Sequence, residues 1–423
     1  MARVFMSDTS PQDALIKSLL TDIRSIAKSK RFIDWGESGS FSASLAQILS
    51  NTQRHLLPNH PTQAIKVLDL FLSLGERVMN RCDDSNGDIS GEFREAFMLW
   101  GKAWAVLPDF DAKIFAQSIW KHLDTNDYGL ADEVIPASAD ALKRKGLDEL
   151  ETLVKSHHHK NTDSFPVFHA LRDIALLRQS PEAFQEVFKF TGRVQTISDQ
   201  LDFARLLIKS TRNQEAIILL ESIDDTAHYG RDSLDLLIEL YSLEGNTDKA
   251  QQLRWRGFMT RSDLKYYQEY VECLADATDK GKALSAAIEH ATNHQSYLTA
   301  LQLLNDLGQP DKAASVFRQK YDSIDGNHYH SLKGIAKDFS KAGYTLEAVL
   351  IYRRLAESIL SRAKSKYYDY AIGYLKKSME LGANVHDWIN YPSTTAYFEQ
   401  LRTDHAKKPA FMKSFVNLMT LIS

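Results

Sequence analysis

The sequence predicts an all-α fold, an α-solenoid of antiparallel helix pairs, on two observations. Apolar residues recur at intervals of three and four along almost the whole chain, as in Leu15, Leu19, Ile23 and Ile26, which is the period of a helix that buries one face. Alternating strand-like runs joined by hairpin turns are absent from the sequence. Helix pairs that cannot bury their apolar faces alone have to stack on neighbouring pairs.

The first half of the sequence predicts helical pairs without a regular period. Apolar periodicity marks helical stretches near residues 12–29, 40–56, 61–80, 90–106, 112–122, 137–156 and 166–190. The polar stretch 156–163 separates this half from the rest. We therefore expect an irregular N-terminal helical-pair region over residues 1–160. A repeat region with basic C-terminal helices follows over residues 161–423.

The second half repeats one pattern. A turn position, glycine in three of four copies, stands five residues before an alanine and four residues after a large apolar residue. Glycine permits the left-handed backbone that ends a helix, and alanine lets the next helix approach closely. The turn positions are Thr211, Gly245, Gly308 and Gly343. Their separations are 34, 63 and 35 residues, so a degenerate copy is expected near residues 280–287.

A helix–turn–helix of 34 residues with this glycine-to-alanine step resembles the tetratricopeptide repeat. The aromatic residue expected four positions after the alanine is present as Phe317 and Tyr352. Arrays of this kind form a superhelix whose concave side holds peptides or other proteins. The resemblance therefore implies a tetratricopeptide-like C-terminal half with a binding surface on its concave face.

Several local strings are similar to a bacterial helical-repeat family of unknown function. The strings occupy residues 28–35, 82–89, 351–356, 367–371 and 398–408. That family is related to helical regions that accompany SWIM-type zinc fingers. The resemblance implies an all-helical solenoid and supplies no catalytic residues. The zinc ligands of the SWIM module are absent, because Cys82 and Cys273 lie far apart and have no spaced partners.

Composition excludes several classes of protein. The chain has 423 residues, 43% hydrophobic and 25% charged, with two cysteines, which is unlike disordered, collagen-like or disulfide-scaffold proteins. No secretory signal and no apolar run long enough to cross a bilayer is visible, so we expect a cytoplasmic protein with reduced thiols. The net charge of -4 is an average of a basic segment from Arg353 onward and an acidic remainder.

One loop is a candidate metal site. Asp83, Asp84, Asn86 and Asp88 surround Gly87, and oxygen ligands of this kind suit calcium. In the register of a calcium-binding hand, however, the first and twelfth positions are Cys82 and Phe93, so both required carboxylates are missing. The alternative is a tight turn in which these side chains cap the following helix.

Basic residues near both ends of the chain are candidate phosphate contacts. At the C-terminal end they are Arg402, Lys407, Lys408 and Lys413, with His405 among them. At the N-terminal end Lys30 and Arg31 precede Trp35. Basic groups interleaved with aromatic rings are typical of nucleic-acid-binding surfaces. The alternative is a solvated basic helix face.

Other conspicuous residues have a structural interpretation. Trp100 and Trp104 lie four apart and are expected to pack in the core. Residues 124–129 are expected to form a capped turn, and His157, His158 and His159 to be exposed to solvent. His328 and His330 lack a partner at fixed spacing, and metal-protease, phosphate-loop and serine-nucleophile motifs are absent from the sequence. We therefore expect neither an enzyme nor a cofactor.

The sequence thus favours a non-enzymatic interaction or scaffold protein. The concave face over residues 200–360 is its expected site, and another protein or a peptide is its expected partner. The alternative is a nucleic-acid-associated repeat protein that binds through its basic N- and C-terminal patches. We expect no membrane partner.

Overall fold

The computed structural model describes residues 11–158, 165–223 and 230–420 and confirms the predicted all-α solenoid fold. Within these residues extended structure is limited to an isolated parallel bridge between Ile33 and Cys82. The chain divides into two compact units, residues 1–229 and 230–423. The boundary expected at residue 160 concerns the regularity of the repeats. It lies among residues 159–164, outside those described, and stays a prediction.

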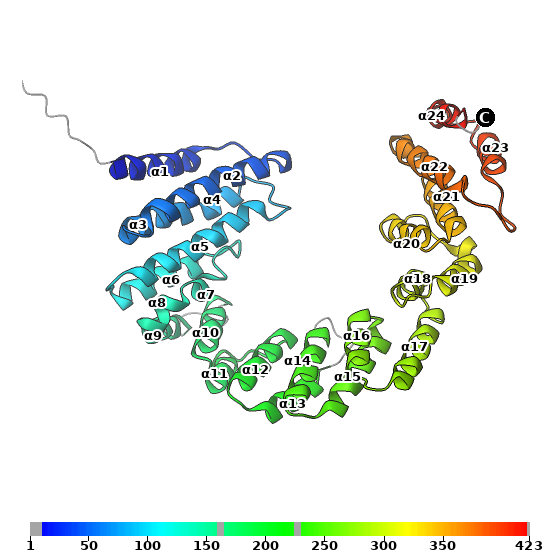
Figure 1. Cartoon of the computed structure of the whole chain (residues 1–423). Coiled ribbons are helices and arrows are strands. Elements are labelled where there is room, and N and C mark those ends of the chain that lie inside the picture. Colours follow the sequence, from blue (N-terminus) through cyan, green and yellow to red (C-terminus); the bar gives the residue numbers. More distant parts are fainter. Residues whose placement is uncertain (1–10, 159–164, 224–229, 421–423) are drawn as a thin grey trace, which may run out of the picture. The chain divides into compact units, whose positions relative to one another are not determined.

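The N-terminal unit consists of short antiparallel helices joined by tight connections (Figure 1). Its helices are α1 (Pro11–Lys28), α2 (Trp35–Asn51), η1 (Thr52–Leu56), α3 (Pro61–Leu72), α4 (Gly75–Met79), α5 (Asp88–Val106), α6 (Ala112–Asp124), α7 (Val134–Ala137), α8 (Ala139–Arg144), α9 (Leu147–His158), α10 (Phe165–Arg178), α11 (Pro181–Thr191), α12 (Ile197–Lys209) and α13 (Asn213–Glu221).

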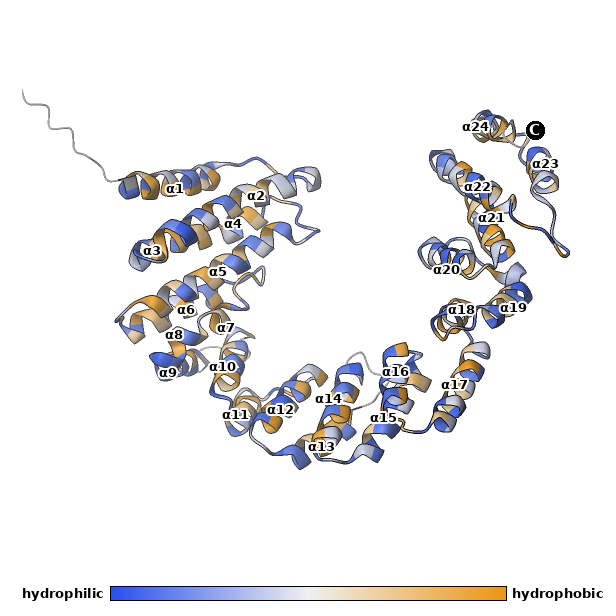
Figure 2. Cartoon of the chain, in the orientation of Figure 1, coloured by the Kyte–Doolittle hydropathy of each residue, from blue (hydrophilic) through white to orange (hydrophobic). Residues whose placement is uncertain are grey.

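The C-terminal unit continues the same architecture. Its helices are α14 (Gly230–Leu243), α15 (Thr247–Arg261), α16 (Leu264–Glu272), α17 (Ala277–Thr292), α18 (Tyr297–Asp306), α19 (Pro310–Lys320), η2 (Tyr321–Ser323), α20 (Tyr329–Lys341), α21 (Thr345–Ser361), η3 (Ser365–Tyr367), α22 (Tyr368–Gly382), α23 (Thr394–Asp404) and α24 (Pro409–Met419). Many of these helices carry hydrophobic and hydrophilic residues on different sides, as the amphipathic period requires (Figure 2). No helix in the described ranges is both long and apolar enough to span a bilayer.

The four predicted turns share one backbone geometry. Thr211, Gly245, Gly308 and Gly343 have φ angles of 59°, 74°, 69° and 88°. The next residue in each copy donates its N–H to the carbonyl of the large apolar residue, closing a Schellman motif. These bonds are Arg212 to Leu207 at 2.9 Å, and Asn246 to Tyr241, Gln309 to Leu304 and Tyr344 to Phe339 at 2.8 Å. The repeated pattern is therefore a helix stop that sets the angle between paired helices.

The same turn occurs once more, before the first copy recognised in the sequence. Gln179 has a φ of 52°, and Ser180 N–H donates to Ala175 O at 3.3 Å. Gln179 lies 32 residues before Thr211. The turn geometry therefore occurs at least one copy earlier than the four turns identified in the sequence. The pattern is hidden because glutamine replaces glycine and the buried Phe184 replaces the alanine.

The wide gap between Gly245 and Gly308 holds the degenerate copy that the spacing predicts. α16 and α17 form it, joined by residues 273–276, where φ stays negative. Ala283, Ala287 and Ala291 line the buried face of α17. Small residues thus still permit close helix packing although the left-handed stop has been lost.

Replacing Thr211 by glycine is expected to stabilise the protein by about 1 kcal/mol, because a β-branched residue is strained at positive φ. Urea denaturation of the full chain measures this change. Thr191→Gly, within α11, is the matched control and should destabilise by a similar amount. A Thr211→Gly variant less stable than the wild type would contradict the strained-turn assignment.

A buried arginine fastens the long connection between α22 and α23. Arg353 on α21 is 1% exposed, and its guanidinium carbon lies 4.7 Å from the ring centre of Trp388 and 4.2 Å from that of Tyr397. Its Nη1 donates to Pro392 O at 2.8 Å. Tyr397 Oη in turn donates to Glu357 Oε1 at 2.8 Å. One cation thus holds residues of the 383–393 segment against α21.

The tryptophan pair lies in the core of the N-terminal unit. Trp100 is fully buried and donates its Nε1–H to Asp69 Oδ1 at 2.7 Å. Its ring lies 5.8 Å from that of Trp104 and 5.7 Å from that of Phe115. The predicted core role is confirmed for Trp100, whereas Trp104 is half-buried beside it. Cys82 and Cys273 are both free thiols.

Candidate functional site

The predicted metal loop has the geometry of a capped turn. The two carboxylate oxygens of Asp84 accept the N–H groups of Ile89 at 2.8 Å and Ser90 at 3.0 Å, which caps α5. Asp83 accepts the N–H of Ser85 at 3.1 Å. Hydrogen bonding with Ser85 holds the pKa of the Asp83 carboxyl below its ordinary value. One carboxylate oxygen of Asp83 and both of Asp84 therefore accept hydrogen bonds within the turn.

The rest of the loop joins two of the strings singled out in the sequence. Asn86 Oδ1 accepts the Trp35 indole N–H at 3.1 Å, and Asp88 O accepts the Ser42 hydroxyl at 3.3 Å. Asp83 N–H donates to Ile33 O at 2.9 Å. Hydrogen bonds from segment 82–89 thus hold the start of α5 against segment 28–35 and the start of α2. Across the described residues, no three His, Cys, Asp or Glu side chains form a metal-binding group. Calcium binding by this loop stays a prediction.

Replacing Asp84 by alanine is expected to lower the free energy of unfolding by about 1–2 kcal/mol, because two N–H groups at the start of α5 lose their acceptor. Thermal denaturation with and without calcium measures this loss of stability and also tests whether the loop binds calcium. Asp83→Ala is the control and should cost less, since its bonds stay within the exposed turn. A melting temperature that calcium raises in the wild type and not in Asp84→Ala would favour a metal site instead.

The candidate histidines are engaged in local contacts. His157, next to the last residue of α9, has its ring 4.7 Å from that of Trp120 and its Nδ1 2.9 Å from Leu153 O. It is half-buried and therefore less exposed to solvent than expected. His159 and the side chain of His158 lie outside the described residues. His328 Nδ1 lies 3.0 Å from Tyr297 Oη, and the His330 ring packs 4.1 Å from that of Tyr329. His328 and His330 thus contact different tyrosines.

The candidate phosphate contacts are only partly available. Arg402 pairs with Glu399 at 2.6 Å. Lys408 Nζ donates to Leu360 O at 2.7 Å, and partial burial lowers its pKa. Lys407 and Lys413 are exposed. At the N-terminal end, Arg31 is paired with Glu37. Neighbouring acceptors thus contact several of these cations, and phosphate binding by them stays a prediction.

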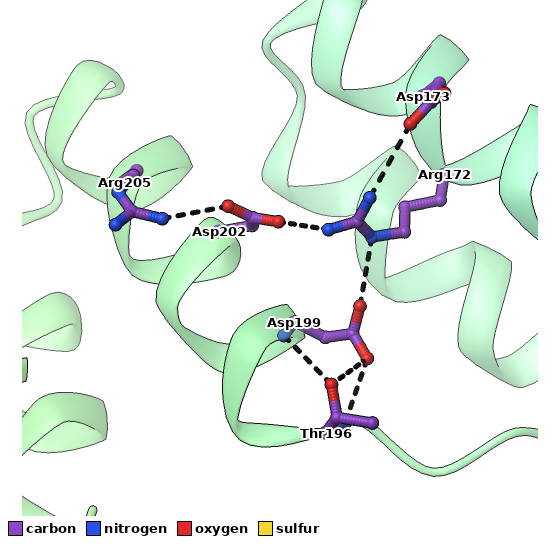
Figure 3. Close-up of polar contacts among 6 residues, drawn as sticks. All are labelled: Arg172, Asp173, Thr196, Asp199, Asp202 and Arg205. Carbon is purple, nitrogen blue, oxygen red and sulfur yellow. Dashed lines mark hydrogen bonds and ion pairs between the residues drawn. The ribbon is translucent and has the colours of Figure 1, made fainter. Parts of the chain in front are cut away.

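A charged network that sequence reasoning missed joins α10 to α12 (Figure 3). Arg172 contacts three carboxylates: Asp199 at 3.0 Å, Asp173 at 3.6 Å, and Asp202. Asp202 also pairs with Arg205 at 3.0 Å, and Asp199 closes a capping box with Thr196. The spacing of Asp199, Asp202 and Arg205 along one helix face was the available signal.

One carboxyl of this network, that of Asp173, has a strongly raised pKa. Burial raises the pKa of the Asp173 carboxyl to about 7, against the partly compensating attraction of Arg172, and the nearby Asp202 raises it further. Arg172 lies closer to Asp199 than to Asp173. The network therefore ties helices together and holds a titrating carboxyl at neutral pH.

Tyrosines from three successive helices gather on one surface of the C-terminal unit. The aromatic-basic face, as we call it, comprises Tyr329 and Lys333 of α20, Tyr352 of α21, and Tyr370 and Tyr374 of α22. Tyr329 is 45% exposed and Tyr370 64% exposed. The Tyr352 and Tyr374 ring centres lie 6.3 Å apart, and Lys333 Nζ lies 5.8 Å from the centre of the Tyr329 ring.

The Tyr374 hydroxyl lies near the other phenols of this face. Burial is the main cause that raises the pKa of its hydroxyl, and the neighbouring phenols of Tyr329, Tyr352 and Tyr370 raise it further. Tyrosine is enriched at protein interfaces because it offers a large contact area and a polar end. This face is therefore the candidate binding site of the C-terminal unit.

Comparison with known proteins identifies a family. No curated protein matches the chain. One solved structure aligned with it is a circular tandem repeat protein described as having a novel repeat topology and enhanced subunit contact surfaces. It is 10% identical over 97% of this chain and 96% of its own, with a TM-score of 0.18. These comparisons do not test the expected relation to SWIM proteins. The model of a family of unknown function matches residues 3–200 and again residues 167–414. The chain therefore belongs to this family, DUF6880.

Proposed function

We propose that the protein is a non-enzymatic interaction protein whose aromatic-basic face binds an acidic segment of a partner protein. The observation that carries the proposal is the gathering of exposed and half-exposed tyrosines from α20, α21 and α22. Rigid aromatic side chains supply contact area at low conformational-entropy cost. The face overlaps the end of the region 200–360 proposed from the sequence and extends it to Tyr374.

The charge of α20 and α22 sets the chemistry of the partner. Exposed lysines on these helices and on the turn before α22 are Lys333, Lys337, Lys341, Lys364, Lys366, Lys376 and Lys377. Exposed acids on the same helices are Asp369 and Glu380, and Glu380 pairs with Lys377 at 3.4 Å. The surplus of cations attracts an acidic partner and repels a basic one. The expected cytoplasmic location stays a prediction.

The test is selection of peptides that bind the full-length protein, followed by affinity measurement with variants of the face. We expect acidic peptides to be enriched and Tyr370→Ser and Lys333→Glu to weaken their binding by roughly tenfold each. Lys312→Glu, an equal charge change on the exposed side of α19, is the matched control. Selection of peptides without acidic character, or equal binding by all variants, would refute the proposal.

Nucleic acid is the alternative partner, because tyrosines beside lysines also stack bases and contact phosphates. The exposed Lys407 and Lys413 favour it as well. Titration with a single-stranded oligonucleotide separates the two proposals. Nucleic-acid binding predicts that the logarithm of the affinity falls linearly with the logarithm of salt concentration. Absence of binding at low salt removes this alternative.

A further inference from the structure

The N-terminal unit contains a pocket of about 410 Å³ that lies apart from every residue considered for a function above. It opens between α3, α4 and α6, beside the connection that follows α6. Its volume lies within the range of small-molecule sites. The lining consists of Asp69, Leu72, Ser73, Gly75, Glu76, Phe93, Phe97, Ser118, Lys121, His122, Thr125, Asn126, Asp127, Tyr128, Leu130 and Ala131.

The inner wall of the pocket is apolar. Phe93 and Phe97 of α5 and Leu72 of α3 are buried and form it. Gly75 lets Leu130 pack closely beside them, because a Cβ at this position would lie 2.8 Å from a methyl carbon of Leu130. An alkyl chain can therefore enter the pocket and bury its surface against these side chains.

The polar groups of the pocket are mostly anionic. Asp69, Glu76 and Asp127 contribute carboxylates, and Lys121 is the one permanently charged cation among the lining residues. Asp69 Oδ1 accepts the Trp100 indole N–H at 2.7 Å. Burial raises the pKa of the Asp69 carboxyl, and the positive charge of Lys121 partly opposes this rise. Within the described residues, Glu76 and Asp127 are exposed and enter no ion pair. The excess of negative charge thus lies with Glu76 and Asp127.

The remaining titratable side chain in the lining, His122, does not offset that charge. Its ring packs edge-on against Phe97 at 5.1 Å and Trp100 at 5.6 Å. Burial lowers its pKa to about 4, so the imidazole is neutral at pH 7. An anionic ligand would meet three carboxylates here and is disfavoured, whereas a cation gains from them.

We propose that this pocket binds a short aliphatic amine, with its alkyl chain against Phe93, Phe97 and Leu72 and its ammonium group between Glu76 and Asp127. A free diamine and a lysine side chain of another protein share this chemistry. Both have an apolar stem and a compact cation with donors for carboxylate oxygens. The pocket shares no residue with the aromatic-basic face, so each proposal can be tested without the other.

Isothermal titration of the full-length protein tests the proposal with three probes: diaminopentane, N-acetyl-lysine amide and uncharged pentanediol. We expect both amines to bind and pentanediol to give no heat. A diamine that binds more tightly than the lysine derivative identifies a free amine as the ligand. The reverse order identifies a lysine side chain.

Substitutions of the charged residues that line the pocket should weaken or strengthen amine binding according to the charge removed. Glu76→Gln and Asp127→Asn should each weaken amine binding roughly tenfold, because a charged hydrogen bond is lost. Lys121→Gln should strengthen it, a gain that general damage to the fold would not produce. Glu95→Gln, on the exposed surface of α5 outside the pocket, is the matched control and should leave binding unchanged. No heat from either amine, equal heat from pentanediol, or unchanged affinity in Glu76→Gln and Asp127→Asn would overturn the proposal.

Discussion

The Gly101→Ala variant is expected to lose about 3 kcal/mol of stability, because α5 and α7 touch through their backbones at this position. A Cβ on Gly101 would lie 2.1 Å from the carbonyl oxygen of Ala137 and 2.7 Å from its carbonyl carbon. These atoms belong to the backbone and cannot rotate away as a flexible side chain would. The two helices would have to separate, which opens the core around Trp100.

Gly91→Ala on the same helix is the matched control. A Cβ at Gly91 meets nothing within 4 Å, so alanine should stabilise α5 by up to about 1 kcal/mol through its higher helix propensity. Urea denaturation of both variants, followed by tryptophan fluorescence, measures the contrast. Equal stability of Gly101→Ala and the wild type would show that α5 does not pack on α7 as described.

Removing the cation from the Arg172 network should have a comparably large effect. Arg172→Met is expected to lower the free energy of unfolding by about 3–5 kcal/mol at pH 8, because partly buried carboxylates lose their shared partner. Arg205→Met, at the more exposed end of the network, should cost about 1 kcal/mol or less. Equilibrium denaturation at pH 8 compares the two. Losses of equal size would contradict the central place of Arg172.

The same network should make stability depend on pH. The pKa of Asp173 is about 7 in the folded protein, above its ordinary value of 3.8, so the folded state binds this proton more tightly than the unfolded state. Its contribution to stability is fully present below about pH 4 and is lost as the pH rises through 7. Asp173→Asn removes this loss. The stability advantage of the variant over wild type should therefore grow by roughly 1 kcal/mol per pH unit between pH 5 and 7. An advantage independent of pH would contradict this assignment.

The fold could be predicted from local patterns, because residues close together in the sequence determine both where a helix ends and which of its faces is apolar. Gly245, Gly308 and Gly343 marked the turns, and the spacing of Trp100 and Trp104 marked a core face. Thr211 was recovered only by its position in the repeat. The turn at Gln179 was not recognised in the sequence, because it has neither the glycine nor the following alanine that mark the other turns.

The sites were harder to predict, because they combine residues that only packing brings together. Tyr329 and Tyr374 are far apart in the sequence, and nothing local indicates that their phenols share one surface. The pocket near Glu76 depends on a connection that follows α6. The basic residues near the C-terminal end were visible in the sequence, but the acceptors that occupy Arg402 and Lys408 were not.

The attachment of the 383–393 segment by Arg353 has a consequence for how the C-terminal unit opens. Most of this segment is exposed, and the Arg353 side chain makes one hydrogen bond to it, through the Pro392 carbonyl. Beyond it, Phe398 of α23 and Phe411 and Phe415 of α24 complete an apolar cluster with Leu375 of α22. Since this cluster and the Tyr397–Glu357 hydrogen bond hold α23 and α24 to α21 and α22, we expect the two helices to open together when that packing is lost. The repeats from α14 to α20 need not unfold in that event, so the last two helices form a separate cooperative element.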